Sequence, residues 1–300
     1  MNYCDGVGDL MNCCDGVRDR VNSCVVDPVN RCVVGELMNC CDGGGYLMNY
    51  CDSVGSLMNF CDGVGDLING CDVVADMMNC CDGVGDLKNS CDGVDDTVNR
   101  CVGVPVNRSH VFGYLMNYYD VVCDLMNCCD GVGDLTNCCD GVGDSVNLCS
   151  FGELMNFPDG GGYLMNYCDG VGDLMNCCDV VGDAVNRSAG DPVNLSVDFG
   201  DVMNNCDGVS DLMTCCDGVG DLMICCDVGD MMNCFDVVGD LMNWCDGVDD
   251  PVNLCVGDSV NRCVFGDLMN CCDGVRDQTN CCDGVGDLIN YCENVGELMN

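Results

Sequence analysis

Polar and apolar residues alternate over a short stretch that recurs along the chain, with the form Leu-Met-Asn-x-Cys. Residues 10–14 and 37–41 are two examples. Alternation of this kind predicts a β-strand, because successive side chains of a strand point to opposite faces. Leu, Asn and Cys should therefore share one face, and Met and the variable residue should share the other. The constancy of Asn favours stacking of these strands, since stacked amides can form a hydrogen-bonded ladder.

A short acidic, glycine-rich segment follows each stretch, most often Asp-Gly-Val-Gly-Asp, and this composition predicts a bend. Strand and bend together make a unit close to Met-Asn-Cys-Cys-Asp-Gly-Val-Gly-Asp-Leu. Residues 1–300 form a single uninterrupted array of about 31 degenerate decapeptide repeats, in which we expect no caps and no separate domains. Asn holds the second place of every complete unit except two, which carry Thr214 and Ile224.

Some units are shorter, and the missing residues are mostly the Asp-Gly pair of the bend. The eight-residue units are Val21–Pro28, Val98–Pro105, Val185–Pro192 and Val252–Ser259.

The array predicts an all-β repeat fold. If the chain folds, we expect a short-coil β-solenoid with 10 residues per turn, one unit per coil; otherwise we expect a largely disordered low-complexity chain. A helix is disfavoured because most units carry two Gly and two Asp. Electrostatics opposes the solenoid, since coils about 4.8 Å apart would align Asp beside Asp at a cost on the order of 0.9 kcal/mol per pair in water.

The variation among units favours drift over selection for packing. The third place holds Cys, Tyr, Phe, Ser, Arg, Gly and Trp, with a few Leu and one Asn. The first seven are Cys and all the residues that one base change in a Cys codon produces. A buried position would reject Arg or Trp in place of Cys, because overpacking or burying a charge costs several kcal/mol. The last place varies in the same way, with Met77 and Gln278 replacing Leu.

The charge balance limits the partners. The chain has 51 Asp and Glu against 9 Lys and Arg, which gives a net charge of -42. Nucleic acid and anionic membrane surfaces are therefore excluded as expected partners, because both require basic groups.

Acidic residues interrupt every apolar run before about 18 residues, so we expect no membrane span. Nor do we expect a signal peptide, since the first thirty residues contain no apolar core. Divalent cations remain as candidate partners.

Cysteine contributes 37 residues, nearly all at the third and fourth places of the unit. Doublets such as Cys13-Cys14, Cys128-Cys129 and Cys281-Cys282 suggest disulfides between neighbouring coils, whose α-carbons would lie within the roughly 4.4–6.8 Å that a disulfide permits. The unit resembles in length the ten-residue coils of short insect antifreeze proteins, which use cysteine in this way, but their stacked aromatic or Thr surface is absent here. Self-association through disulfides and binding of a soft metal are the alternatives. The cellular location stays undecided.

The segment Asp-Gly-Val-Gly-Asp is the candidate calcium site, because flexible Gly would let two carboxylates face one Ca²⁺. Examples are Asp5–Asp9, Asp130–Asp134 and Asp217–Asp221. The segment resembles the Gly-rich calcium-binding nonapeptide of secreted β-rolls, which implies calcium as the ligand. It departs from that nonapeptide in its ten-residue period and in the Asp that directly follows Gly-Val-Gly. The alternative interpretation is a solvated turn.

Isolated residues offer no catalytic constellation. The single His110 and the single Lys88 do not make the acid–base pair that catalysis needs. Trp244 is a third-place variant. Glycosylation-like triplets begin at Asn107, Asn186 and Asn194, wherever Ser replaces the fourth-place Cys.

The sequence therefore predicts no enzyme, no catalytic residue and no cofactor-binding residue. The leading hypothesis is a translated tandem repeat, or a fragment of one, without assignable biochemical activity. The alternative is a secreted or surface structural repeat protein, which disulfides stitch together and which binds calcium through its Asp-Gly-Val-Gly-Asp turns.

Overall fold

The computed structural model is all-β in the residues that it describes. The chain divides into two compact units, unit 1 (Met1–Gly152) and unit 2 (Glu153–Asn300). The described residues are 2–4, 10–14, 20–24, 28–32, 36–41, 45–52, 56–63, 65–72, 76–92, 96–109, 113–120, 124–141, 143–170, 172–179, 182–196, 200–209, 211–218, 220–235, 239–248, 250, 252–255, 258–265, 267–273, 277–282, 287–293 and 298–299.

Nearly every decapeptide unit contributes one short strand. The strands of unit 1 are β1 (Asn2–Cys4), β2 (Leu10–Cys14), β3 (Arg20–Cys24), β4 (Pro28–Cys32), β5 (Leu37–Cys41), β6 (Leu47–Cys51), β7 (Leu57–Cys61), β8 (Leu67–Cys71), β9 (Met77–Val84), β10 (Leu87–Cys91), β11 (Thr97–Val102), β12 (Pro105–Ser109), β13 (Tyr114–Tyr119), β14 (Leu125–Val132), β15 (Asp134–Cys139) and β16 (Ser145–Phe151).

The strands of unit 2 are β17 (Leu154–Pro158), β18 (Leu164–Cys168), β19 (Leu174–Cys178), β20 (Ala184–Ser188), β21 (Pro192–Ser196), β22 (Val202–Val209), β23 (Leu212–Cys216), β24 (Leu222–Val228), β25 (Met231–Phe235), β26 (Leu241–Val248), β27 (Val252–Cys255), β28 (Ser259–Phe265), β29 (Leu268–Asp273), β30 (Gln278–Cys282), β31 (Leu288–Glu293) and β32 (Leu298–Met299).

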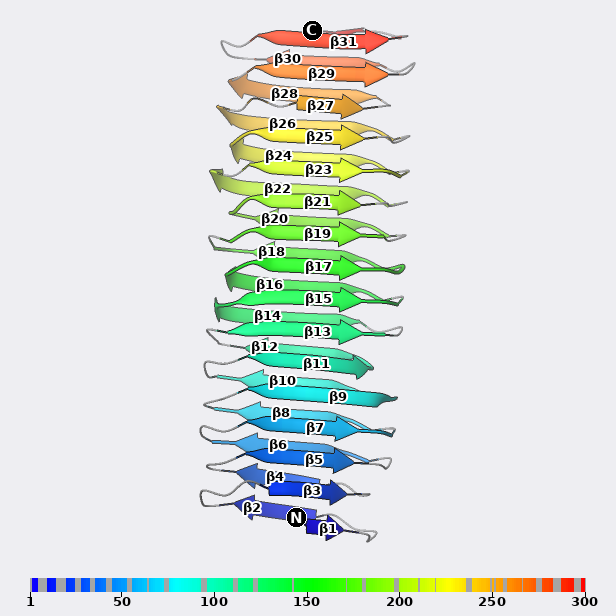
Figure 1. The fold of residues 1–300 in the computed structure, drawn as a ribbon. Coiled ribbons are helices and arrows are strands. Elements are labelled where there is room, and N and C mark those ends of the chain that lie inside the picture. Colours follow the sequence, from blue (N-terminus) through cyan, green and yellow to red (C-terminus); the bar gives the residue numbers. More distant parts are fainter. Residues whose placement is uncertain are drawn as a thin grey trace. The chain divides into compact units, whose positions relative to one another are not determined.

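Within each unit the odd-numbered strands follow one another in one sheet and the even-numbered strands in a second sheet. Neighbours within a sheet are parallel and in register; Leu47 pairs with Leu67, and Asn49 pairs with Asn69. The arrows of the two sheets point in opposite directions (Figure 1). Consecutive strands thus lie in opposite sheets, and the expected β-solenoid of stacked coils is confirmed, in place of a largely disordered chain.

One detail of the expectation is corrected, because a coil holds two decapeptide units rather than one. Strands that stack on each other are about 20 residues apart, as in the pairing of Asn39 with Asn59, instead of 10. The physical reason lies inside the coil. Two units per coil bring the inward amides of both sheets to the same central line, where they bond across the coil as well as along it. A one-unit coil would offer only the bonds along the stack.

The alternation of inward and outward side chains follows the prediction. In β6, Leu47 and Asn49 are buried, whereas Met48 is half-buried and Tyr50 is exposed. The same alternation of buried and more exposed positions runs along β7 and β8. The last, second and fourth places of the unit therefore face the interior, and the first and third places face solvent.

The inward asparagines of unit 1 form a continuous ladder from Asn30 to Asn147. Asn127 shows the pattern: its Nδ2 donates to Oδ1 of Asn137 at 3.0 Å across the coil and to Oδ1 of Asn147 at 2.9 Å in the next coil. Its own Oδ1 accepts from Asn117 at 3.4 Å and from Asn107 at 2.8 Å. Both N–H groups and both lone pairs of a buried amide are thus used, so its burial carries no desolvation penalty from an unmade bond.

Apolar side chains form a seam on each side of the ladder. The Leu row of one sheet faces the Cys row of the other, so that Leu47, Leu67 and Leu87 pack with Cys101 in unit 1. On the other side of the same ladder, Leu37, Leu57 and Met77 pack with Cys71. The ladder keeps these two clusters apart.

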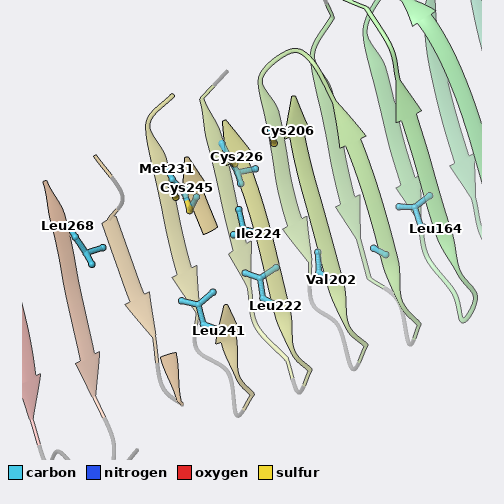
Figure 2. Packing of buried hydrophobic residues seen from close by; sticks show 12 residues of the cluster. Leu164, Val202, Cys206, Leu222, Ile224, Cys226, Met231, Leu241, Cys245 and Leu268 are labelled. Carbon is cyan, nitrogen blue, oxygen red and sulfur yellow. The ribbon is translucent and has the colours of Figure 1, made fainter. Parts of the chain in front are cut away.

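Unit 2 differs because Ile224 replaces an asparagine of the ladder. Ile224 is fully buried and belongs to a single cluster that contains inward residues from both sheets (Figure 2). Asn204 donates to Thr214 Oγ1 at 3.3 Å, where the ladder would continue with another amide. Beyond the break, Oδ1 of Asn233 and Oδ1 of Asn243 are buried without a hydrogen-bond partner. An isoleucine therefore joins the two seams and leaves amide oxygens unpaired.

Glycines at the eighth place allow the bends of successive coils to stack. A Cβ on Gly65 would lie 1.6 Å from the carbonyl oxygen of Gly45, and one on Gly85 would lie 1.6 Å from that of Gly65. The same clash with the preceding coil recurs at Gly182 and Gly220 in unit 2. Close backbone approach, more than positive φ, is what these positions require.

The shortened units keep the strand register, because the missing residues come from the bend. Asn89 pairs with Asn107, 18 residues later, and the ladder bond between them is 2.8 Å long. Gly103 lies in this shortened bend with a φ of 159°, and Gly152 lies in another with a φ of 124°. Positive φ is thus used where a bend must close with fewer residues.

The aspartates before the strands are stabilised by the neighbouring coils. In unit 2 the backbone N–H of Asp221 donates to Oδ1 of Asp201 at 2.9 Å, and that of Asp240 donates to Oδ1 of Asp221 at 3.0 Å. Each bond pairs a carboxylate with a backbone donor of the next coil, and it opposes the repulsion between neighbouring carboxylates, which is on the order of 0.9 kcal/mol per pair in water. The acidic stacking that opposed the fold in the sequence is therefore offset locally.

None of the described residues belongs to a helix of the length and apolarity needed to cross a membrane.

Replacing Asn127 by Leu should lower the free energy of unfolding by about 3 kcal/mol or more, because two donors and two acceptors of neighbouring amides lose their partners. Met126→Ala, on the same strand but exposed, is the matched control and should change it by less than about 1 kcal/mol. Urea denaturation followed by circular dichroism measures both. Equal effects of the two substitutions would show that the ladder does not stabilise the coils.

Gly85→Ala should destabilise the chain severely, since the added Cβ would meet the Gly65 carbonyl oxygen and the two coils would have to separate. Gly70→Ala is the control, because its Cβ would come no closer than 3.2 Å to any atom, and that atom belongs to the exposed ring of Tyr50. Thermal melts should show a loss of at least about 5 °C for the first variant and little change for the second. A Gly85→Ala chain as stable as the unmodified one would contradict the close stacking of the bends.

Candidate functional site

The outward face of each sheet is built from the first and third places of the unit. Met126 and Met242 are exposed first-place residues, and Trp244, at the third place, is 45% exposed. The third place accepts Arg or Trp in place of Cys because its side chain lies on the surface. The sequence argument that took this column as a sign of drift is therefore corrected: a surface position varies freely whether or not the fold is selected.

Arginines of the outward face pair with aspartates of the next coil. Arg31 Nη2 lies 2.9 Å from Asp52 Oδ2, and Arg187 forms the equivalent pair with Asp207. The guanidinium of Arg262 lies 4.8 Å from the ring centroid of Trp244, its in-register neighbour. Water and salt screen such exposed pairs, so they stabilise the fold little. The ring of Trp244 thus stacks against the guanidinium of Arg262.

The two cysteines of a doublet point to opposite faces of their strand, so a doublet does not present two thiols to one metal ion. Cys128 occupies the outward third place and Cys129 the inward fourth place, beside Cys149 of the next coil in its sheet. Cys281 is exposed. The side chains of Cys13, Cys14 and Cys282 lie outside the described residues.

The inward cysteines instead form rows along the stack. In unit 1, β5, β7, β9 and β11 pair Cys41 with Cys61, Cys61 with Cys81 and Cys81 with Cys101. We call these four residues the inward thiol row. Cys61 and Cys81 are free thiols in this structure, and each forms hydrogen bonds with the thiols on both sides. Tyr119 takes the next fourth-place position of this sheet, and its hydroxyl donates to Asn117 Oδ1 at 3.1 Å.

These contacts shift the acidity of the inward thiols. The hydrogen bond with Cys41 lowers the pKa of Cys61, but the bond with Cys81 and burial raise it, and the outcome is a pKa of about 12. The bond with Cys101 raises the pKa of Cys81 as well. By contrast, the bond with Cys71 lowers the pKa of Cys51. With a pKa of about 12, the thiol of Cys61 stays protonated well above neutral pH.

The candidate calcium segments are only partly described. Asp5–Asp9 lies outside the described residues. In Asp130–Asp134, Asp130 is exposed and accepts a hydrogen bond from Ser150 Oγ at 3.1 Å. In Asp217–Asp221, Oδ1 of Asp221 accepts the backbone N–H of Asp240 in the next coil. Oδ1 of Asp221 is thus used in the contact between coils. Calcium binding by the second carboxylate oxygen of Asp221 stays a prediction.

The glycosylation-like asparagines and Lys88 lie in parts of the coil where the structure gives them no role in chemistry. Asn107, Asn186 and Asn194 are buried members of the ladder, and a sugar could reach their amides only after the coil opens. Lys88 faces solvent, with Nζ 3.9 Å from Asp86 Oδ2. His110 lies outside the described residues.

Within the described ranges, no group of three or more His, Cys, Asp or Glu side chains is arranged to hold a metal ion. No protein-family model, curated protein or solved structure matches the chain. The function must therefore be argued from the coils themselves.

The raised pKa of Cys61 should make stability fall in alkaline solution. Below pH 9.0, the ordinary value, the thiol is protonated in both states and its contribution to stability is complete. As the pH rises from there through about 12, the unfolded chain has lost a proton that the folded chain keeps, so this contribution is lost.

Urea midpoints between pH 8 and 11 check this expectation. The unmodified chain should lose stability more steeply than Cys61→Ser, by the equivalent of up to one proton. A Cys61→Ser slope that matches that of the unmodified chain would contradict the shift.

Proposed function

We propose that this chain is a structural repeat protein without catalytic activity, which serves as a scaffold of regularly spaced surface side chains. The single observation that carries the proposal is the asparagine ladder, in which each amide of the continuous stretch bonds both across its coil and to the neighbouring coils. The ladder fixes the coils in register. It therefore repeats the outward first and third places at the spacing of β-strands, about 4.8 Å.

The division between inward and outward places supports this function. The inward second place keeps Asn in all complete units except those with Thr214 and Ile224, and the outward third place holds residues of every size and charge. Gly85 and its equivalents are fixed by close backbone contact. The inward last place is less strict, since it buries the polar side chains of Thr97 and Gln278. Hydrogen bonding and backbone packing thus constrain the unit more than apolar content does.

The charge of the chain favours partners that are cationic or neutral. With a net charge of -42 the scaffold would repel nucleic acid and anionic lipid surfaces. Divalent cations at the acidic bends, and disulfide-linked self-association through exposed cysteines such as Cys281, remain parts of the proposal.

A second candidate is a translated tandem repeat that was never selected for an activity. The two candidates differ in where codon differences between units should fall. Selection for the scaffold should concentrate amino-acid replacements at the first and third places and leave mostly silent differences at the second and eighth. Without selection, silent differences should be as scarce as replacements at the second and eighth places. The coding DNA of the array decides between them.

Folding of the purified chain in EDTA with a thiol reductant tests the scaffold itself. The ladder requires neither calcium nor disulfides, so we expect a β-sheet circular dichroism spectrum and slow hydrogen exchange at the asparagine-bearing strands. A coil spectrum that turns to β only on addition of Ca²⁺ would overturn the metal-free scaffold and support a calcium-loaded array. Asn127→Leu serves as the matched variant, and exchange should speed up around its strand.

A further inference from the structure

The inward thiol row combines regular spacing with a largely buried, apolar environment. Its four sulfurs come from consecutive strands of one sheet, and the paired α-carbons of such strands lie about 4.8 Å apart. Hydrogen bonds between the thiols show that the sulfurs face one another along the stack. Leu47, Leu67 and Leu87 of the opposite sheet pack against them. Cys101 is 3% exposed, and the other three are half-buried, which leaves a route from solvent.

We propose that the inward thiol row binds Cu(I) as a chain of two-coordinate thiolate bridges, one ion between each pair of neighbouring cysteines. Soft thiolate ligands select Cu(I) among the metals available to proteins. A metal–thiolate bond is about 2.3 Å long in zinc sites, so two bonds of similar length in a line span about 4.6 Å. That span is close to the separation of the strands. The spacing of the strands therefore suits a two-coordinate sulfur–metal–sulfur bridge, which the hydrogen-bonded thiols reach by rotation of their side chains.

The reaction is balanced by release of the thiol protons. Four thiols bind three Cu⁺ ions and release four H⁺, so the loaded row carries a charge of −1: 4 RSH + 3 Cu⁺ → [Cu₃(SR)₄]⁻ + 4 H⁺. No electron is transferred. Cys61 and Cys81 each bridge two ions, and sharing keeps the buried charge small. The acidic surface of the chain, with 51 Asp and Glu, raises the local concentration of cations around it.

The same geometry disfavours zinc. A structural zinc site needs four ligands in a tetrahedron. Each position between two coils of the row offers two sulfurs, and Leu67 and its neighbours occupy the side that faces the opposite sheet. The outward cysteines provide no second sulfur at the paired positions. Cys40 pairs with Ser23 and Phe60, and Cys80 pairs with Phe60 and Arg100.

The test is an anaerobic titration of the full, reduced chain with Cu(I) supplied as its acetonitrile complex, followed by gel filtration and metal analysis. Cys61→Ser with Cys81→Ser should lose about three bound Cu(I) ions, because every bridge of the row needs one of these two sulfurs. The matched control, Cys40→Ser with Cys80→Ser, removes outward thiols of the neighbouring positions and should lose none. Equal losses in the two double variants would overturn the proposal.

A gain-of-binding variant makes the test independent of damage to the fold. Tyr119 interrupts the row and lies in register between Cys101 and Cys139. Tyr119→Cys should therefore add about two Cu(I) ions. X-ray absorption of the unmodified loaded chain should show two sulfur neighbours per copper, and proton release should exceed the copper bound. The linear row would be refuted if Tyr119→Cys bound no additional Cu(I), or if each copper had three or more sulfur neighbours. Zinc bound as tightly as Cu(I) would refute the selectivity of the row.

Discussion

The structure depends on one interaction, the hydrogen bonding of a buried primary amide on all of its donors and acceptors. An amide in a protein interior costs free energy unless its two N–H groups and its carbonyl oxygen find partners. Asn127 meets this condition with two bonds across the coil and two along the stack. Only a coil of two units supplies both kinds. The amide therefore explains the near constancy of Asn, the parallel register of the sheets and the 20-residue coil together.

The break in unit 2 shows what the ladder excludes. With Ile224 and Thr214 in place of amides, the apolar seams join into one cluster, while Oδ1 of Asn233 stays unpaired. Apolar burial thus replaces part of what hydrogen bonding provides elsewhere, as expected where both terms are of the order of a few kcal/mol. The fold tolerates one such exchange because the amides resume immediately beyond it; Asn243 bonds to Asn253 at 2.9 Å.

The chemistry of the chain is set by which side of a strand a residue occupies. In the described part of the chain, inward cysteines pack with other thiols and with inward apolar side chains, so their pKa values respond to their neighbours along the stack, as at Cys61. Outward arginines meet solvent and the aspartates of adjacent coils. Carboxylates before the strands accept backbone N–H groups, and this offsets much of the repulsion that the composition implies. A strongly acidic, cysteine-rich composition is therefore compatible with an ordered interior.

The sequence by itself determined the all-β repeat fold, the alternation that places Leu, Asn and Cys inward, and the bend at the acidic glycine segment, because these follow from the two-residue period of a strand and from local turn chemistry. The tertiary structure alone decided the number of units per coil, since the same alternation fits one unit or two. It also showed that the third-place variation is surface variation, that Gly85 is fixed by the backbone of Gly65, and that Cys41, Cys61 and Cys81 lie in one row. The coil size, the Gly85 contact and the thiol row all depend on contacts between residues about 20 positions apart, and a repeating sequence does not show which of its copies are in contact.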